Sequence, residues 1–248
     1  MASRIPSGEI RTILDEHYGI KLGKVQKVTA RISNHVLIAS SSLGKLVIRL
    51  PQGQKTDCAE IDLEARVTSA LIDSELPVRR IVKTYDGKNF VLAANGTPIT
   101  VFKFISGKFL DKVERQHLEE AGKVLRQIHE TLSNFENRGQ LIHGDFNPGN
   151  FVWTADKISG ILDLEHVRAG QVEEDLATLT AHYIFLLPCF NPNEVIKGIL
   201  TGYGNLSIME FKVQLVKTLE WLASWQVGKT GYFAERIAAT KQGLPNLV

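Results

Sequence analysis

The most informative segment of the sequence lies in the middle of the chain. Residues 141–150 read Leu-Ile-His143-Gly144-Asp145-Phe146-Asn147-Pro148-Gly149-Asn150. Two apolar runs follow, Phe151–Trp153 and Ile158–Leu162, and the polar turn between them predicts a β-hairpin. Asp163 comes directly after the second run. Because an antiparallel hairpin brings its two ends together, we expect Asp145 and Asn150 to lie close to Asp163.

The residue types gathered at these ends point to phosphoryl transfer. Carboxylate and amide oxygens are the hard ligands that Mg²⁺ prefers, with phosphates and water completing its coordination. Phosphoryl transfer also needs one carboxylate that can accept the proton of an attacking hydroxyl. We therefore predict that Asn150 and Asp163 are metal ligands and that Asp145 is the catalytic base. Pro148 and Gly149 supply the tight turn between base and ligand.

The spacing of this segment matches a known pattern. His143, Asp145 and Asn150 have the H-x-D-x-x-x-x-N spacing of the protein-kinase catalytic loop. With Gly144 at its second position and the distal Asp163, the segment closely resembles the aminoglycoside phosphotransferase and choline kinase family of small-molecule kinases. The resemblance covers roughly residues 10–180. It implies ATP and Mg²⁺ as cofactors and an α+β, two-lobed protein-kinase-like fold.

Outward from this segment, the first hundred residues predict a small antiparallel sheet with helices. The predicted helices are Ile10–Tyr18 and Cys58–Ile72, and the predicted strands are Val25–Thr29, His35–Ala39 and Lys45–Leu50. The short apolar run Thr100–Ile105 ends at a candidate connector to the second half of the chain. The pair Asp86-Gly87 predicts a further hairpin between the runs Ile81–Tyr85 and Asn89–Ala93. We predict an N-lobe over residues 1–104 that binds the nucleotide.

The resemblance also implies a nucleotide site in this N-lobe. Family members place a basic residue on the third strand, where Arg49 stands, and a glutamate on the following helix, for which Glu64 is the best candidate. The turn after the first strand is poor in glycine and resembles the phosphate loop of antibiotic kinases. The residues predicted to bind the nucleotide are Arg49, Glu64, Ser33, Asn34, Phe102 and Phe104.

The second lobe, predicted over residues 105–248, is mainly helical. Glu114–Leu132 and Ile208–Gln226 carry apolar residues at helical spacing. His143 is expected to support the backbone of the catalytic loop, as in the resembling family. Asp175 is expected to be structural, as the N-cap of a helix.

The predicted acceptor pocket comes mainly from residues after Asp175, because few residues separate the helix before the catalytic loop from the loop itself. Trp221, Trp225, Tyr203 and His182 are candidates to line it, although helical spacing favours core packing for the two tryptophans. From residue 181 onward the chain has four acidic and six basic residues. A polycationic aminoglycoside would want an acidic pocket, so this balance argues against such a substrate.

Composition excludes several classes of protein. The 248 residues carry a formal net charge of +2, which offers no electrostatic footprint for nucleic acid or a membrane surface. The two cysteines are far apart in the sequence, which excludes a disulfide framework and a C-x-x-C motif. No apolar stretch is long enough to span a bilayer. We expect a cytoplasmic protein, monomeric or homodimeric, without nucleic-acid or membrane partners.

The sequence therefore predicts an ATP-dependent phosphotransferase that moves the γ-phosphate to a hydroxyl of a small molecule, either a metabolite or an antibiotic. A pseudokinase or a nucleotide-dependent regulatory module is the alternative. The complete catalytic set favours the enzyme. A protein acceptor is a weaker possibility because the chain lacks an A-P-E segment.

Overall fold

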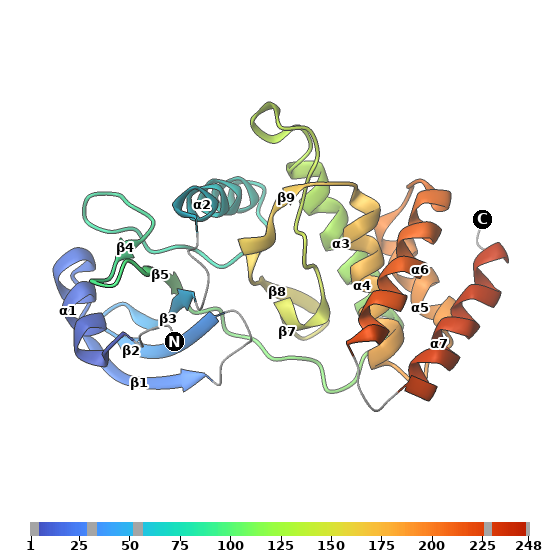
Figure 1. The fold of residues 1–248 in the computed structure, drawn as a ribbon, viewed down its shortest axis with the longest axis horizontal. Helices are drawn as coiled ribbons and strands as arrows, with labels where there is room; N and C mark the ends of the chain where they lie inside the picture. The colour runs from blue at the N-terminus through green and yellow to red at the C-terminus, as the bar shows by residue number, and fades with distance from the viewer. Residues whose placement is uncertain (1–4, 29–33, 52–56, 226–229, 247–248) are drawn as a thin grey trace. The chain divides into compact units, whose positions relative to one another are not determined.

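The computed structural model describes residues 5–28, 34–51, 57–225 and 230–246. The chain forms two compact units (Figure 1). The first consists of Met1–Ser69 and Val78–Ile105, and the second of Ala70–Pro77 and Ser106–Val248. Within the described ranges, no helix is long and apolar enough to cross a membrane.

The first unit is built on a five-stranded antiparallel sheet. Its strands, in the spatial order β1-β2-β3-β5-β4, are β1 Leu22–Val28, β2 Asn34–Ser41, β3 Gly44–Pro51, β5 Pro98–Lys103 and β4 Val91–Leu92. Helix α1 (Ser7–Tyr18) packs its apolar side chains against one set of strand residues, which includes Ile48 and Val101. Side chains alternate between the faces of a strand, so Arg49 on β3 points away from this core.

The predicted hairpin around Asp86-Gly87 is wrong. A turn does form there, with the backbone N–H of Thr84 donating to the carbonyl of Lys88 at 3.0 Å. The flanking runs nevertheless pair with β5 instead of with each other. Val82 N–H donates to the Val101 carbonyl at 2.8 Å, and β4 pairs with β5 through Val91 and Ile99. A buried strand offers a better partner than an isolated two-stranded hairpin, which is marginally stable.

The second unit is mainly helical. Its helices are α3 Arg115–Thr131, α4 Val172–Leu186, α5 Pro192–Tyr203, α6 Ile208–Ser224 and α7 Thr230–Gly243, and the last turns of α2 (Cys58–Asp73) also belong to it. The predicted hairpin after the catalytic loop is present as β7 (Phe151–Thr154) and β8 (Lys157–Ile161). A second small ladder joins β6 (Leu141–Ile142) to β9 (Arg168–Ala169). These two ladders hold both ends of the segment that carries the candidate site.

Helices α3 and α5 approach each other closely at glycines. A Cβ atom on Gly202 would lie 1.8 Å from the Glu119 carbonyl oxygen, and one on Gly122 would lie 2.1 Å from that of Ile199. Only glycine permits this separation of the two backbones. The packing of α3, which leads into the catalytic loop, therefore depends on residues that carry no side chain.

We expect Gly202→Ala to lower the free energy of unfolding by about 3 kcal/mol, because the added methyl group must push the two helices apart. Gly8→Ala is the matched control, since a Cβ on this helical glycine meets nothing within 4 Å. Chemical denaturation measures both variants. Equal stability of Gly202→Ala and wild type would contradict the close contact.

Candidate active site

His143 anchors the loop that follows β6. The side chain is fully buried, and its Nε2 lies 3.3 Å from the carbonyl oxygen of Leu162. Because a carbonyl only accepts, Nε2 carries the hydrogen and Nδ1 is free to accept the backbone N–H of Asp145, at 3.3 Å. Burial lowers the pKa of His143, which keeps the ring neutral. The imidazole thus supports the loop backbone, as the sequence predicts.

Asp145 has a carboxylate whose two oxygens are both held by amides. Asn147 Nδ2 donates to Oδ1 and Asn150 Nδ2 donates to Oδ2, each at 2.8 Å. Asn147 also caps the short turn Pro148–Asn150, because its side-chain oxygen accepts the Gly149 N–H at 2.9 Å. No role for Asn147 is predicted above. Its signal was the Asn-Pro-Gly order, which is typical of a side-chain-capped turn.

Asn150 and Asp163 meet through the hairpin. The backbone N–H of Leu162 donates to the Asn150 carbonyl at 2.6 Å, and Asp163 is the next residue. Asp163 adopts the left-handed conformation, with φ 63° and ψ 57°. That conformation costs a non-glycine residue on the order of 1 kcal/mol or more and is concentrated at functional sites.

The donor set at this point fits a divalent cation. An amide oxygen on Asn150 and a carboxylate on Asp163 are hard oxygen donors, as Mg²⁺ requires. Among the described residues, no group of three or more histidine, cysteine, aspartate or glutamate side chains could hold a metal ion. With two protein oxygens, a cation held by Asn150 and Asp163 would share its coordination with phosphate oxygens and water, which is the usual arrangement for Mg²⁺.

Asp175 is not the N-cap of its helix, so this prediction is wrong. Helix α4 begins after Gln171, which forms a capping box with Glu174. Asp175 lies one turn further along, and its carboxylate accepts the backbone N–H groups of His143 at 2.7 Å and Gly144 at 2.9 Å. It therefore holds the catalytic loop from the side of α4. A sequence pattern identifies the start of a helix but not the partner of a side chain within it.

A buried network extends this support into α3 and α5. His129 Nε2 lies 3.0 Å from Asp175 Oδ2, and His129 Nδ1 lies 2.9 Å from the Tyr203 hydroxyl. Burial alone would raise the pKa of Asp175, but the hydrogen bond and charge of His129 and the contacts with His143 lower it overall. Asp175 therefore stays ionised. Sequence reasoning missed His129 and placed Tyr203 among candidates for the acceptor pocket, whereas its ring is buried against His129.

In the first unit, Arg49 and Glu64 form a buried ion pair. Their side chains are 3% and 4% exposed, and both guanidinium Nη atoms reach the carboxylate, with Nη1 to Oε1 at 3.0 Å. The Arg49 guanidinium carbon also lies 4.9 Å from the centre of the Phe102 ring. The structure therefore brings together three of the residues predicted for the nucleotide site.

Phe102, the third of these residues, is 1% exposed, and the Arg79 guanidinium carbon also lies 4.0 Å from its ring centre. The other predicted nucleotide residues are placed less closely. Phe104 is partly buried and lies beside the Lys45 ammonium. Asn34 begins β2 opposite Pro51. Ser33 lies outside the described residues.

We expect Arg49→Met to destabilise the first unit by about 3–5 kcal/mol, because it leaves the Glu64 carboxylate buried without its partner. The double variant Arg49→Met with Glu64→Leu should recover most of that loss, since no unpaired charge remains. Urea denaturation of the four proteins in this cycle measures the coupling. Additive effects of the two substitutions would contradict the ion pair.

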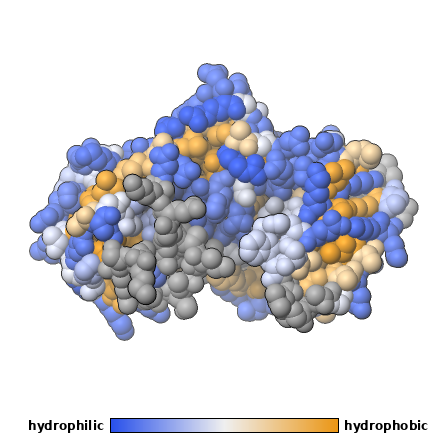
Figure 2. Space-filling model, viewed as in Figure 1, coloured by the Kyte–Doolittle hydropathy of each residue, from blue (hydrophilic) through white to orange (hydrophobic). Residues whose placement is uncertain are grey.

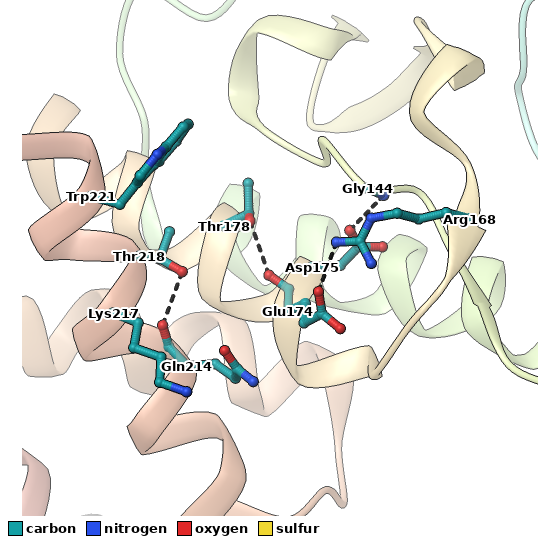
Figure 3. Close-up of a pocket in the computed structure, with 9 residues that line it drawn as sticks. All are labelled: Gly144, Arg168, Glu174, Asp175, Thr178, Gln214, Lys217, Thr218 and Trp221. Carbon is teal, nitrogen blue, oxygen red and sulfur yellow. Dashed lines mark hydrogen bonds and ion pairs between the residues drawn. The ribbon is translucent and has the colours of Figure 1, made fainter. Parts of the chain in front are cut away.

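A pocket of about 250 Å³ opens beside the catalytic loop, and Figure 3 shows the side chains around it. It is lined by Gly144, Arg168, Glu174, Asp175, Thr178, Gln214, Lys217, Thr218 and Trp221. The pocket therefore draws on the catalytic loop, α4 and α6. Five of the nine lining residues come after Asp175 in the sequence, and the use of this pocket by the acceptor stays a prediction.

The prediction that Trp221 and Trp225 pack in the core is wrong. Trp221 is 57% exposed and lines the pocket, and Trp225 is 69% exposed and packs edge to face on Trp221. Figure 2 shows hydrophobic residues reaching the surface among hydrophilic ones over the C-terminal helices. His182 does not line the pocket, and its Nδ1 bonds the Thr178 carbonyl at 2.8 Å. Burial lowers the pKa of His182.

Residues 132–204, which include the catalytic loop and Asp163, match the sequence model described as the phosphotransferase enzyme family. The predicted resemblance is confirmed. The match spans the loop, the hairpin, α4 and α5. A comparison with curated proteins found no match.

Solved structures extend the likeness to the whole chain. An aminoglycoside phosphotransferase from Alicyclobacillus acidocaldarius is 13% identical, with a TM-score of 0.72 and 100% of this chain and 98% of that chain covered. A microcompartment-associated aminopropanol kinase is 14% identical, with a TM-score of 0.68 and coverage of 96% and 95%. An amicoumacin kinase in complex with AMP-PNP, Ca²⁺ and Ami is 13% identical, with a TM-score of 0.67 and coverage of 90% and 88%.

These likenesses establish the fold. The predicted α+β, protein-kinase-like class is confirmed, since the chain aligns over nearly its full length with phosphotransferases of that class. At 13% to 14% identity, these structures do not identify the substrate of this protein.

Proposed function

We propose that this protein is an ATP- and Mg²⁺-dependent phosphotransferase that moves the γ-phosphoryl group to a hydroxyl of a small molecule. The observation that carries the proposal is the Asp145 carboxylate, with one amide on each of its oxygens in a loop anchored by Asp175. Such restraint suits a group that must meet an attacking hydroxyl in one geometry.

Each residue has a role in this proposal. Asp145 orients the acceptor hydroxyl and takes its proton as the bond to phosphorus forms. Asn150 and Asp163 would hold the cation, which neutralises charge on the phosphates when bound. Arg49, set by Glu64, would position the nucleotide phosphates. Most of the rate enhancement would come from positioning and charge neutralisation.

The division of labour follows the two predicted lobes. We propose nucleotide binding by residues 1–104 and catalysis with acceptor binding by residues 105–248, in a cytoplasmic monomer or homodimer. The amicoumacin kinase of the same fold was solved with a nucleotide analogue and Ca²⁺, which supports a nucleotide and a divalent cation as the cofactors.

The test is acceptor-dependent release of ADP across a library of hydroxyl compounds, with Mg²⁺ and with the metal chelated. We expect turnover that requires Mg²⁺. We expect Asp163→Ala to abolish that turnover, because one of the two proposed oxygen ligands is lost. ATP binding by wild type with no turnover on any acceptor would instead favour the regulatory module.

The thermal shift in the presence of ATP, measured while Mg²⁺ is titrated, tests separately whether Asp163→Ala has lost Mg²⁺ binding. The Mg²⁺-dependent part of the shift should disappear in this variant while the fold is retained. Glu165→Ala, two residues further along, is the control. Unchanged Mg²⁺ dependence in Asp163→Ala would remove this residue from the metal site.

A further inference from the structure

The pocket beside the catalytic loop contains one charge that its own walls do not balance. Arg168 is paired with Glu174 at 2.7 Å. Asp175 is engaged with His129 and with the loop backbone. Lys217, by contrast, has no carboxylate within ion-pair distance among the described residues, and it is exposed. Among the described residues, Lys217 is therefore the cation of the pocket wall that has no carboxylate partner.

Two hydroxyl oxygens of the pocket, those of Thr178 and Thr218, are acceptors. Thr178 Oγ1 donates to the Glu174 carbonyl and Thr218 Oγ1 donates to the Gln214 carbonyl, each at 2.9 Å. Their hydroxyl hydrogens are used inside the helices, so each oxygen is left to accept a hydrogen bond. These two oxygens suit a ligand that brings hydroxyl groups of its own.

Trp221 supplies an apolar wall. Its indole is half exposed and stands on α6 one turn after Lys217; in Figure 3 the ring points toward the top of the view and the Lys217 side chain toward the bottom, with Thr218 between them. A ligand whose charged end reaches Lys217 must therefore extend past Thr218 to pack its carbon skeleton against the ring. The volume of about 250 Å³ lies below the ~300–1,000 Å³ of pockets for drug-sized ligands, which indicates a small metabolite.

The position of the pocket connects it with the proposed reaction. Gly144 forms part of its lining, and Asp145 is the next residue. A ligand in the pocket therefore contacts the loop that carries the proposed base, although the Asp145 side chain is not part of the lining.

We propose that the acceptor carries a carboxylate in addition to its hydroxyl, with Lys217 binding the carboxylate and Trp221 packing against the carbon skeleton. This inference rests on the proposed function for the reaction, but binding can be tested without turnover. A polycationic acceptor would face the unbalanced Lys217 ammonium, which is a repulsive contact.

Binding is measured by the change in tryptophan fluorescence with two series of probes that differ only at one terminus. The first series is gluconate, sorbitol and glucamine, and the second is glycerate, glycerol and 3-amino-1,2-propanediol. In at least one series we expect the carboxylate to bind about tenfold more tightly than the amine, the strength of a charge-assisted hydrogen bond. Trp221→Phe should remove most of the signal. No preference for the carboxylate in either series would overturn the proposal.

Lys217→Met should abolish the preference for the carboxylate and leave the affinity for the neutral probe within about twofold. Lys197→Met, an exposed lysine on α5 outside the pocket, is the matched control and should behave as wild type. A carboxylate preference that survives in Lys217→Met would overturn the role of this residue.

Turnover separates this inference from the proposed function. If the carboxylate probes bind through Lys217 but no hydroxyl compound releases ADP, the proposed function fails and the pocket assignment stands. If the wild type phosphorylates cationic acceptors better than anionic ones, the phosphotransferase stands and the carboxylate class is wrong.

Discussion

Asp145→Asn should lower kcat by about 10³-fold or more while leaving the protein folded, because the amide cannot accept the proton of the acceptor hydroxyl. The substitution removes the proton acceptor while nearly keeping the size and shape of the side chain. Asparagine has nearly the outline of aspartate, but it offers one oxygen where Asn147 and Asn150 each need one. A small loss of stability should accompany the large loss of rate.

Acceptor-dependent release of ADP measures the rate, and circular dichroism on heating measures the fold. Asp111→Asn is the matched control, since Asp111 is an exposed aspartate of the same unit. Turnover of Asp145→Asn at the rate of the control would exclude Asp145 as the base and would leave the proposed mechanism without its proton acceptor.

Asp175→Ala should lower the free energy of unfolding by about 3–5 kcal/mol, because several buried donors lose their acceptor at once. The N–H groups of His143 and Gly144 and the His129 ring all converge on this carboxylate. Turnover should also fall, since the loop that carries Asp145 is no longer held against α4. Chemical denaturation and kcat are the two measurements.

The pH dependence distinguishes a charged from a merely polar role of Asp175. Its pKa is lowered in the folded protein, so the carboxylate contributes stability that is present above its unfolded pKa of 3.8 and lost as the pH falls through the folded value. Asp175→Asn should lack the part of the stability loss at acid pH that comes from protonation of this carboxylate. If wild type and Asp175→Asn lose stability in parallel below pH 3.8, the charge does not stabilise the loop.

Local patterns carried the prediction where neighbours in the sequence are also neighbours in space. The hairpin β7–β8 follows from two apolar runs and a polar turn, and it brings Asn150 and the residue before Asp163 into direct hydrogen bonding. Helices α3 and α6 follow from apolar spacing and begin and end within about two residues of their predicted limits. In these cases a short loop or the helical period settles the geometry.

Long-range partners could not be predicted in the same way. The run before Asp86 pairs with β5 because that strand offers a buried edge, which no local turn signal encodes. Asp175 was predicted to be a helix cap. Its hydrogen bonds with His129 and Gly144 could not be predicted, because they depend on how α3, α4 and the loop pack together. Asn147 and His129 were missed for the same reason.

Spacing and turn chemistry act over a few residues, so they sufficed to predict the order of the catalytic set and the hairpin, and the fold class followed from the family resemblance of these residues. The burial of individual side chains depends instead on how elements distant in the sequence pack together. Helical spacing made Trp221 a core residue, yet its side chain is 57% exposed and lines the pocket. Periodicity identifies a face of a helix, whereas burial depends on whether another element packs against it.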